Sequence, residues 1–400
     1  MLDLQGLTDD LCEKLGRSIA VDNRYIEVIA ASAQIGEIDR IRSEAILNRR
    51  TEPEIVEYVK SLGIAQADRP VQVPPHPDLN TLARWCFPLR QAGRLLGFLW
   101  IINHPPLTDH EFSLATRYAT EIASILARNI EQADTILRTS VQLTNDLLRE
   151  GDVGALELAG RSGMLVTLGQ ATVWSMLPSA EKGTHTAVTT ADLFALLADL
   201  LATTHPGSFV GAPIEDRLVL VARNSVDGRD HQPLLTAAQL SCRRKHLRLR
   251  AVGGADMAEG LSPKEALERA TFAATVARWD GHEEVRRWES LGAWTLLRGH
   301  PWSSELIRSI SPSAHKLIQL TKADLWETLL IYFESGANVQ ATCQTLHIHR
   351  ATLYYRLGRI KEIAGEEILN SGWEQASAQL ALRVWSARQR AHCEGRLTPL

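Results

Sequence analysis

The run from Leu107 to Glu150 contains neither proline nor glycine, and this feature constrains the fold of the chain most. It begins with Thr108-Asp109-His110-Glu111, a capping-box pattern that is typical of a helix start. A helix over the whole run would be about 60 Å long at about 1.5 Å per residue, longer than a small domain is wide. The chain is therefore predicted to form separate compact domains before and after this helix.

Two roles remain open for the predicted helix. Its apolar positions are Leu114, Tyr118, Ile122, Ile125, Ile136, Val141, Leu143 and Leu147. They would allow the helix to pair with its twin in a second copy of the chain, as a connector that dimerises and passes movement along. Alternatively, the helix packs twice on its own chain and is broken near Ala133 and Asp134.

The composition is that of an ordinary globular protein, with 45% hydrophobic and 22% charged residues. Because the formal net charge is −4, any contact with nucleic acid must come from a local basic patch. The five cysteines show neither a disulfide nor a zinc-site spacing, which indicates a reducing cytoplasm. The acidic N-terminus does not resemble a signal peptide, and the longest apolar run, Leu95 to Ile102, is too short to cross a bilayer. We expect a cytoplasmic protein with no membrane contact, metal or cofactor.

The first 106 residues are predicted to form a small α/β domain. The patterns favour an amphipathic helix from Leu4 to Gly16, a hairpin of 18–21 and 24–30 around Asp22-Asn23, a charged helix over 37–62, a proline-rich connection, and a hairpin of 84–89 and 94–102 around Gln91-Ala92-Gly93. This order resembles a GAF-type sensory domain, a fold that often holds a small ligand over its sheet. Trp85, Cys86 and Trp100 are candidates to line such a pocket, and the simpler interpretation is that they fill a core.

A second α/β domain is predicted over residues 151–300. Its expected elements are a strand over 172–177, a helix over 190–203, a hairpin of 208–214 and 217–222, a helix over 234–245, a strand over 247–252 and a helix from Ser262 to Trp279. This order resembles the degenerate GGDEF-like middle domain of PucR/CdaR-type regulators. The segments Ser262–Ala266 and Trp288–Gly292 are similar to the end of that family domain.

The middle domain is expected to have no enzymatic activity. A nucleotide cyclase of the GGDEF class needs a glycine pair at a hairpin tip and adjacent carboxylates that hold Mg²⁺. The sequence Gly253-Gly254-Ala255-Asp256 lies past a predicted strand, and the predicted hairpin tip, Glu215-Asp216, carries no glycine. The pair His347 and His349 has metal-ligand spacing, but it lies in a predicted turn, where DNA contact or capping is the better interpretation.

The C-terminal part of the chain predicts two short helices joined by a turn. A helix over 324–333 stops at Ser335-Gly336, Asn338 caps a helix over 339–346, and the turn His347-Ile348-His349 leads to a helix over 350–364 that ends at Gly365. The turn residue Ile348 is expected to point inward, and Leu353, Leu357 and Ile360 are expected to form the buried stripe of the second helix. The pattern is typical of a helix-turn-helix.

The second of these helices is basic in an acidic chain. The segment from Asn338 to Gly365 contains one carboxylate, Glu362, and four cations: Arg350, Arg356, Arg359 and Lys361. In a recognition helix the N-terminal residues contact base edges and the flanking cations contact phosphates. The candidates for base or near-base contacts are His349, Arg350, Thr352 and Tyr354, those for backbone contacts are Arg356, Arg359 and Lys361, and Tyr355 shares their exposed face.

The segment ATCQTLHIHRATLYYRLGRI, residues 341–360, resembles the C-terminal helix-turn-helix of PucR-type regulators, and residues 379–383 resemble the closing helix of that domain. The resemblance implies binding to double-stranded DNA. Ala351 stands where the family usually has asparagine, which implies a different DNA site or a greater reliance on His349.

The predicted fold class is a multidomain α/β protein with an all-α C-terminal part. We expect a GAF-like sensor over 1–106, a connector helix over 107–150, a GGDEF-like domain over 151–300 and a helix-turn-helix domain over 320–390. The expected function is that of a one-component transcriptional regulator, with operator DNA, a second copy of the chain and a small-molecule effector as partners. The alternatives are a divergent nucleotide cyclase with a helical dimerisation tail, and a protein-interaction module that binds no DNA.

Overall fold

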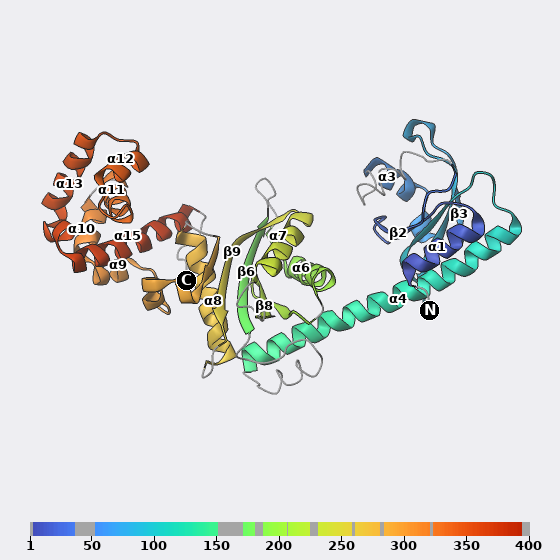
Figure 1. The fold of residues 1–400 in the computed structure, drawn as a ribbon, viewed down its shortest axis with the longest axis horizontal. Helices are drawn as coiled ribbons and strands as arrows, with labels where there is room; N and C mark the ends of the chain where they lie inside the picture. The colour runs from blue at the N-terminus through green and yellow to red at the C-terminus, as the bar shows by residue number, and fades with distance from the viewer. Residues whose placement is uncertain are drawn as a thin grey trace. The chain divides into compact units, whose positions relative to one another are not determined.

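A computed structural model describes residues 3–36, 53–150, 171–180, 187–205, 207–224, 231–257, 261–280, 284–320 and 323–393. Most of the predicted helix over 37–62 and the first twenty residues of the predicted middle domain lie outside the described residues. The chain forms two compact units, Met1–Thr135 and Ile136–Leu400, which are described separately (Figure 1). Among the described helices, none is both long and apolar enough to cross a membrane.

The first unit is built on a five-stranded antiparallel sheet with the strand order β2-β1-β5-β4-β3. Its elements are α1 (Leu4–Leu15), β1 (Ile19–Asn23), β2 (Val28–Ala31), α3 (Pro53–Ser61), η1 (Ile64–Gln66), β3 (Val71–Val73), η2 (Pro77–Leu79), β4 (Arg84–Gln91), β5 (Arg94–Ile102) and the first part of α4 (Asp109–Asn145). The second predicted hairpin, β4–β5, is confirmed.

Both faces of this sheet are covered by helices. On one face, Leu11 of α1 and Ile122 of α4 pack with Phe87 and Leu99 of the sheet. On the other face, residues of α3 and η1, including Ile55, pack against Phe98 and Trp100. The sheet strands therefore carry apolar residues on both sides, as a strand buried on both faces requires.

The predicted turn of the first hairpin is wrong by two residues. Asp22 and Asn23 belong to strand β1, and the chain turns between Asn23 and Val28. Asn23 accepts hydrogen bonds from the backbone N–H groups of Tyr25 and Glu27, so its side chain builds the turn that follows it. As a result, Asp22 is buried in the sheet.

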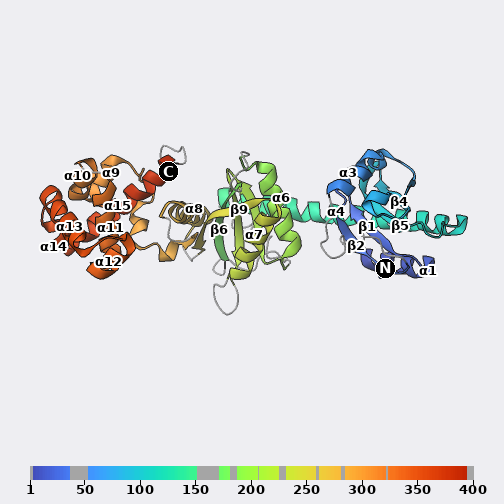
Figure 2. The ribbon, with the colours of Figure 1, turned by 90° about the horizontal axis from the view of Figure 1, so that it is seen from above.

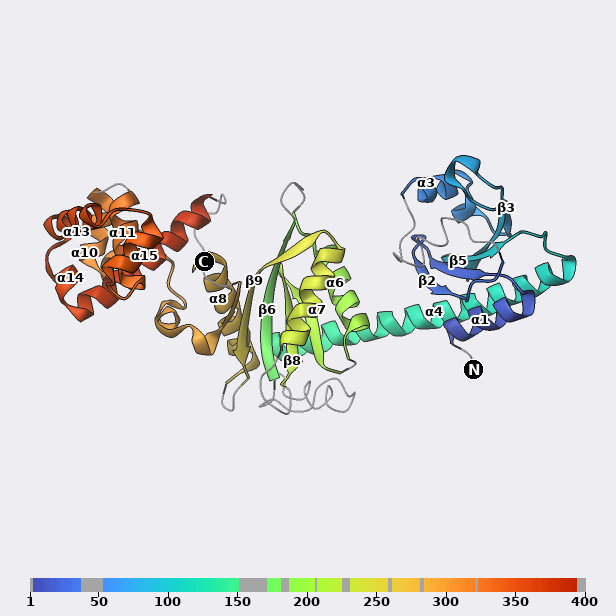
Figure 3. The same cartoon turned by 45° about the horizontal axis from the view of Figure 1, so that its top comes forward.

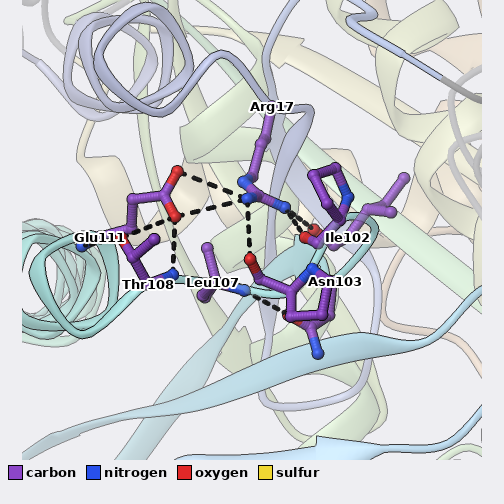
Figure 4. Close-up of polar contacts among 8 residues, drawn as sticks. Arg17, Ile102, Asn103, Leu107, Thr108 and Glu111 are labelled. Atoms are coloured by element: carbon purple, nitrogen blue, oxygen red, sulfur yellow. Dashed lines mark hydrogen bonds and ion pairs between the residues drawn. The ribbon is translucent and has the colours of Figure 1, made fainter.

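A buried arginine joins the end of α1 to the start of α4 (Figure 4). The guanidinium group of Arg17 donates to the carbonyl oxygens of Pro105 and, at 3.3 Å, Pro106, and its Nη2 lies 3.4 Å from Oε1 of Glu111. Glu111 also completes the predicted capping box, because its Oε2 accepts from the backbone N–H of Thr108 at 2.7 Å. These contacts lower the pKa of Glu111, chiefly through the hydrogen bond from the Thr108 backbone. The start of α4 is therefore fixed to the first unit.

Helix α4 is continuous from Asp109 to Asn145, and a π-helical turn, η3 (Asp146–Glu150), follows it. The predicted break near Ala133 and Asp134 is wrong. The first part of the helix packs in the core of the first unit, and Leu143 packs in a core of the second unit. The helix therefore packs twice on its own chain without a break, because the exposed stretch between the two cores keeps its backbone hydrogen bonds within the helix. Pairing with a second copy stays a prediction.

The middle part of the second unit is a second five-stranded sheet with the order β10-β9-β6-β8-β7. Its elements are β6 (Ala171–Ala180), α6 (Thr190–Thr203), β7 (Phe209–Ile214), β8 (Arg217–Arg223), α7 (Gln232–Arg244), β9 (Leu247–Asp256), α8 (Pro263–Asp280) and β10 (Val285–Arg287). All neighbouring strands are antiparallel except β10, which runs parallel to β9 at the edge. The strands and helices follow one another in the predicted order. The GGDEF-like assignment itself stays a prediction.

Helices cover both faces of this sheet too (Figure 3). Helices α6 and α7 pack on the face that carries Trp174 and Leu220, while α8 and the end of α4 pack on the face that carries Val173 and Val219. The alternation of side chains along each strand separates the two cores.

The glycine pair Gly253-Gly254 lies within β9, so the prediction that it follows the strand is wrong. A Cβ atom on Gly253 would lie 2.0 Å from the carbonyl oxygen of Ala270 in α8, and one on Gly254 would lie 2.7 Å from the ring of Trp174. Each glycine is thus required by close packing, one on each face of the sheet.

The C-terminal part of the second unit is a helical bundle (Figure 2). It contains η5 (Trp288–Ser290), η6 (Gly292–Leu297), α9 (Ser304–Ile310), α10 (Pro312–Leu320), α11 (Ala323–Glu334), α12 (Val339–Leu346), α13 (Arg350–Ala364), α14 (Glu367–Asn370) and α15 (Gly372–Cys393). Trp302, Leu317, Leu329 and Leu382 are fully buried in its core. The mixed α/β parts and the helical C-terminal part agree with the predicted fold class.

Candidate nucleic-acid interface

Helices α12 and α13 form the predicted helix-turn-helix. The side chain of Asn338 caps α12 by accepting a hydrogen bond of 3.0 Å from the backbone N–H of Ala341. His347 then adopts a left-handed conformation (φ 53°) that ends α12, and Ile348 packs on the bundle core as expected. His349 occupies the N-cap position of α13 but makes no capping hydrogen bond there. The short turn lets both helices pack on the same apolar core.

One side of α13 is buried and the other is exposed. Leu353, Leu357 and Ile360 pack in the bundle core, which confirms the predicted stripe. Six of the eight candidate DNA-contacting residues have exposed side chains: His349, Arg350, Thr352, Tyr354, Tyr355 and Arg359. Tyr355 is 69% exposed, so its ring and hydroxyl group are accessible to a partner. The structure therefore leaves these candidates accessible around the exposed side of α13, away from its buried stripe.

The N-terminal end of α13 presents Arg350 and Tyr354, one helical turn apart, as a pair. The Arg350 guanidinium donates to the Tyr354 hydroxyl at 3.3 Å and lies 5.6 Å from the centre of its ring. The aromatic ring holds the cation along the helix surface, where a cation–π contact adds to the hydrogen bond. The pair is positioned at the end of the helix that reads bases in such domains.

Arg359 is exposed and pairs with Glu362 one turn later in the same helix. A surface ion pair of this kind contributes about 0.3 to 0.5 kcal/mol, so a phosphate can replace the carboxylate at little cost. Lys361 is partly buried. Arg359 is therefore more accessible than Lys361 for a contact with the DNA backbone.

Arg356 lies between α13 and α11 and differs from the other candidate cations. Its Nη1 donates to Oγ1 of the buried Thr328 at 3.0 Å, and its Nη2 lies 3.8 Å from Oδ2 of Asp324. The side chain is only 22% exposed. These contacts favour a role in holding the recognition helix on α11.

Replacing Arg356 by alanine is expected to lower the free energy of unfolding of the second unit by about 1 to 2 kcal/mol, because Thr328 loses a charged donor. Arg356→Lys should not restore stability, since an ammonium group cannot reproduce the forked contact. Urea unfolding of both variants measures this effect. The alternative is that Arg356 contacts a DNA phosphate. In that case Arg356→Ala would be as stable as the wild type and its DNA binding would depend less on salt, and Arg356→Lys would restore the wild-type salt dependence.

Sequence reasoning missed the exposed side of α12. A groove of about 580 Å³ runs between α12 and the start of α13, and it is lined by Asn338, Val339, Gln340, Cys343, Gln344, Ile348 and Arg350. In helix-turn-helix domains the first helix crosses the DNA backbone, and amides are suitable donors to phosphate oxygens. Gln340 and Gln344 are therefore added to the candidate contacts. Their long amide side chains at i and i+4 of this short helix were the available signal.

The predicted pocket residues of the first unit lie on two different faces of the sheet. Cys86 and Trp100 belong to the core beside α3, whereas Trp85 packs on the core beside α1 and α4. Adjacent residues of a strand point to opposite faces, so Trp85 cannot share a pocket with Cys86. Burial raises the pKa of Cys86 well above its usual range, and its thiol is therefore uncharged.

Comparison with known families identifies the two ends of the chain. Residues 325–384 match the PucR C-terminal helix-turn-helix domain, and residues 3–126 match the GAF domain. The chain thus carries a GAF domain and a PucR-type helix-turn-helix domain. The GAF match includes the first part of α4, in agreement with the packing of that helix in the first core. The helix-turn-helix domain supports a DNA-binding transcriptional regulator.

Similar proteins cover only parts of the chain or share little sequence. An uncharacterised protein of Haemophilus influenzae is 40% identical over 73 residues, which is 18% of this chain and 19% of that protein. The regulator of polyketide synthase expression from Bifidobacterium adolescentis has a TM-score of 0.28 and 16% identity, over 64% of this chain and 97% of its own. A GAF domain/HD domain protein from Geobacter sulfurreducens has a TM-score of 0.25 and 17% identity, over 32% of this chain and 94% of its own. At such TM-scores neither structural likeness supports an assignment.

Proposed function

We propose that the protein is a one-component transcriptional regulator of the cytoplasm that binds operator DNA through α12 and α13. The GAF domain either senses a small effector or serves dimerisation, and the protein acts as a homodimer or a larger assembly, because operators for such helices are usually symmetric. The observation that carries the proposal is the exposed polar face of α13, set on a buried apolar stripe within a matched helix-turn-helix domain.

Binding of the full chain to fragments of its own genome, followed over a salt titration, tests the proposal. The affinity is expected to fall linearly with salt on logarithmic axes. Arg350→Ala should weaken binding to the selected site by about 1 to 3 kcal/mol, and Arg359→Ala should reduce the salt slope by about 1. Lys60→Ala removes the same charge from an exposed position of α3 and is the matched control. A flat salt response, or variants indistinguishable from Lys60→Ala, would exclude DNA binding by this face.

The middle domain is proposed to be a degenerate GGDEF-like domain without enzymatic activity. Its hairpin tip carries Glu215 and Asp216 in place of a glycine pair, and Gly253 and Gly254 are used for packing inside β9. Both observations favour a structural domain over a cyclase. Nucleotide turnover with Mg²⁺ that is lost in Asp216→Ala would support the enzyme alternative. Failure to enrich any DNA motif would instead support the protein-interaction alternative.

A further inference from the structure

Helix α8 belongs to two cores of the second unit. Ala266 and Ala270 in its first part pack under the middle sheet. Phe272, Val276 and Trp279 in its second part pack in the core of the helical bundle that carries α12 and α13. The bundle is therefore joined to the middle domain through a shared helix and a shared apolar core.

A buried carboxylate marks the end of this shared helix. Asp280, the last residue of α8, has a side chain that is 3% exposed. Its Oδ2 lies 2.7 Å from Nη2 of Arg286 in β10, and its Oδ1 lies 3.0 Å from Nη1 of Arg383 in α15. A buried charge is tolerated only when it is closely paired, so this carboxylate holds one arginine from the sheet and one from the bundle.

Arg383 continues the connection towards the helix-turn-helix. Its second amino group, Nη2, lies 3.0 Å from Oε1 of Glu334. Glu334 is the last residue of α11, and the turn that follows leads directly to Asn338, the cap of α12. One guanidinium group thus contacts both the end of α8 and the end of the helix that precedes the DNA-binding pair.

The sheet side of this connection is the edge strand β10. In its parallel register with β9, Arg286 is opposite Gly253 and Arg287 is opposite Gly254, so the two arginines point to opposite faces of the sheet. Arg287 pairs with Asp256 of β9 and lies 5.8 Å from the ring centre of Trp174. Strand β10 therefore contacts the core beside α6 and α7 on one face and Asp280 on the other.

We propose that Asp280, Arg383 and Glu334 form an ionic relay that couples the middle sheet to the position of the helix-turn-helix. The relay places α11, and with it α12, in the arrangement that binds DNA. Because one guanidinium group pairs with both carboxylates, a displacement of either carboxylate alters the pairing of the other. The effect of the relay on DNA affinity rests on the proposed function, which is DNA binding through α12 and α13.

The test uses the full chain with Glu334→Gln and Asp280→Asn. Glu334→Gln removes the charge at the bundle end of the relay and leaves only a weaker, neutral acceptor for Arg383, while the residues that contact Asp280 stay unchanged. Glu268→Gln, which removes one partner of the exposed Arg298–Glu268 pair (3.0 Å), is the matched control. Amide hydrogen exchange and DNA affinity are measured for each variant.

In both relay variants, the amide hydrogens of α12 are expected to exchange about fivefold faster than in the wild type. The DNA affinity is expected to be about tenfold lower, which is a typical coupling between two sites. The salt slope should stay that of the wild type, since no phosphate contact is lost. Coupling is reciprocal, so DNA should slow exchange of β10 in the wild type and not in Glu334→Gln. A rigid brace without coupling would give no DNA effect on β10.

The relay is overturned if folded Glu334→Gln behaves like Glu268→Gln in exchange and affinity, or if DNA leaves β10 of the wild type unchanged. If Asp280→Asn does not fold, Glu334→Gln alone decides. If the wild type binds no DNA, the proposed function fails, and the exchange of α12 without DNA still tests the structural connection between Glu334 and Arg383.

Discussion

Replacing Gly253 by alanine is expected to lower the free energy of unfolding of the second unit by about 3 kcal/mol, the upper end of the usual cost of overpacking a core. The added methyl group would lie 2.0 Å from the carbonyl oxygen of Ala270 and 2.2 Å from the amide nitrogen of Ala274. Both atoms belong to the backbone of α8, so no side-chain rotation relieves the clash. Urea unfolding measures the loss in the free energy of unfolding, and amide hydrogen exchange locates it at α8 and β9.

Gly358→Ala is the matched control for this substitution. Gly358 lies in the exposed face of α13, and a Cβ atom there meets nothing within 4 Å. Alanine in a helix interior is favoured over glycine by about 1 kcal/mol, so this variant should be at least as stable as the wild type. An unfolding midpoint of Gly253→Ala equal to that of Gly358→Ala would contradict the close packing of α8 on β9.

Asp22→Asn is expected to stabilise the first unit by about 2 kcal/mol at pH 8. Burial raises the pKa of Asp22 to about 7, although the hydrogen bond from Trp100 and the charge of Arg84 oppose this shift. One pKa unit corresponds to about 1.36 kcal/mol, so ionising this carboxyl in the fold costs up to about 4 kcal/mol relative to an unfolded pKa of 3.8. Asparagine keeps an acceptor for Trp100 without a charge, but its NH₂ group is left without a clear acceptor, which removes part of the gain.

The sign of the pH dependence follows from the raised pKa. Ionisation of Asp22 in the fold lowers the free energy of unfolding. This loss is smallest below about pH 4, grows as the pH rises to about 7, and is constant above that. The advantage of Asp22→Asn should therefore grow from pH 4 to pH 7 and then level off. Asp68→Asn, at a carboxylate whose side chain is 88% exposed, is the matched control. Thermal unfolding at pH 5 and pH 8 separates the two, and an equal effect of Asp22→Asn at both values would disprove the buried acid.

Much of the secondary structure could be predicted from the sequence, because it depends on local signals. The helix over 190–203 has the predicted bounds, since Thr189 and Asp192 form a capping box at its start. The turn Ala92-Gly93 has positive φ at both residues, as a tight hairpin requires. Asp22-Asn23 carried an equally good turn signal, but Asp22 instead accepts a hydrogen bond of 2.8 Å from Trp100 of a strand far along the chain. The residues around Asp22 in the sequence do not indicate that Trp100 lies beside it in the fold.

The same distinction applies to the candidate DNA-binding residues. The exposed face of α13 follows from its apolar spacing, because Leu353, Leu357 and Ile360 determine which side is buried. Arg356 carries the same charge as Arg359 at helical spacing, and the positions of Asp324 and Thr328 on α11 separate their environments. The DNA contacts of all these residues stay predictions.

The sequence by itself determined the order of the helices and strands from β6 to α8, which side of α13 is buried, and that the chain has a helix-turn-helix near its end. Capping, side-chain period and turn conformation act between residues a few positions apart, so they can be identified in one dimension. The tertiary structure alone decided that Gly253 and Gly254 serve packing, that α8 is shared by two cores and that Asp280 is paired with Arg383. These features depend on which distant backbone or charge fills the space beside a residue, and a buried group acquires its role only from that neighbour.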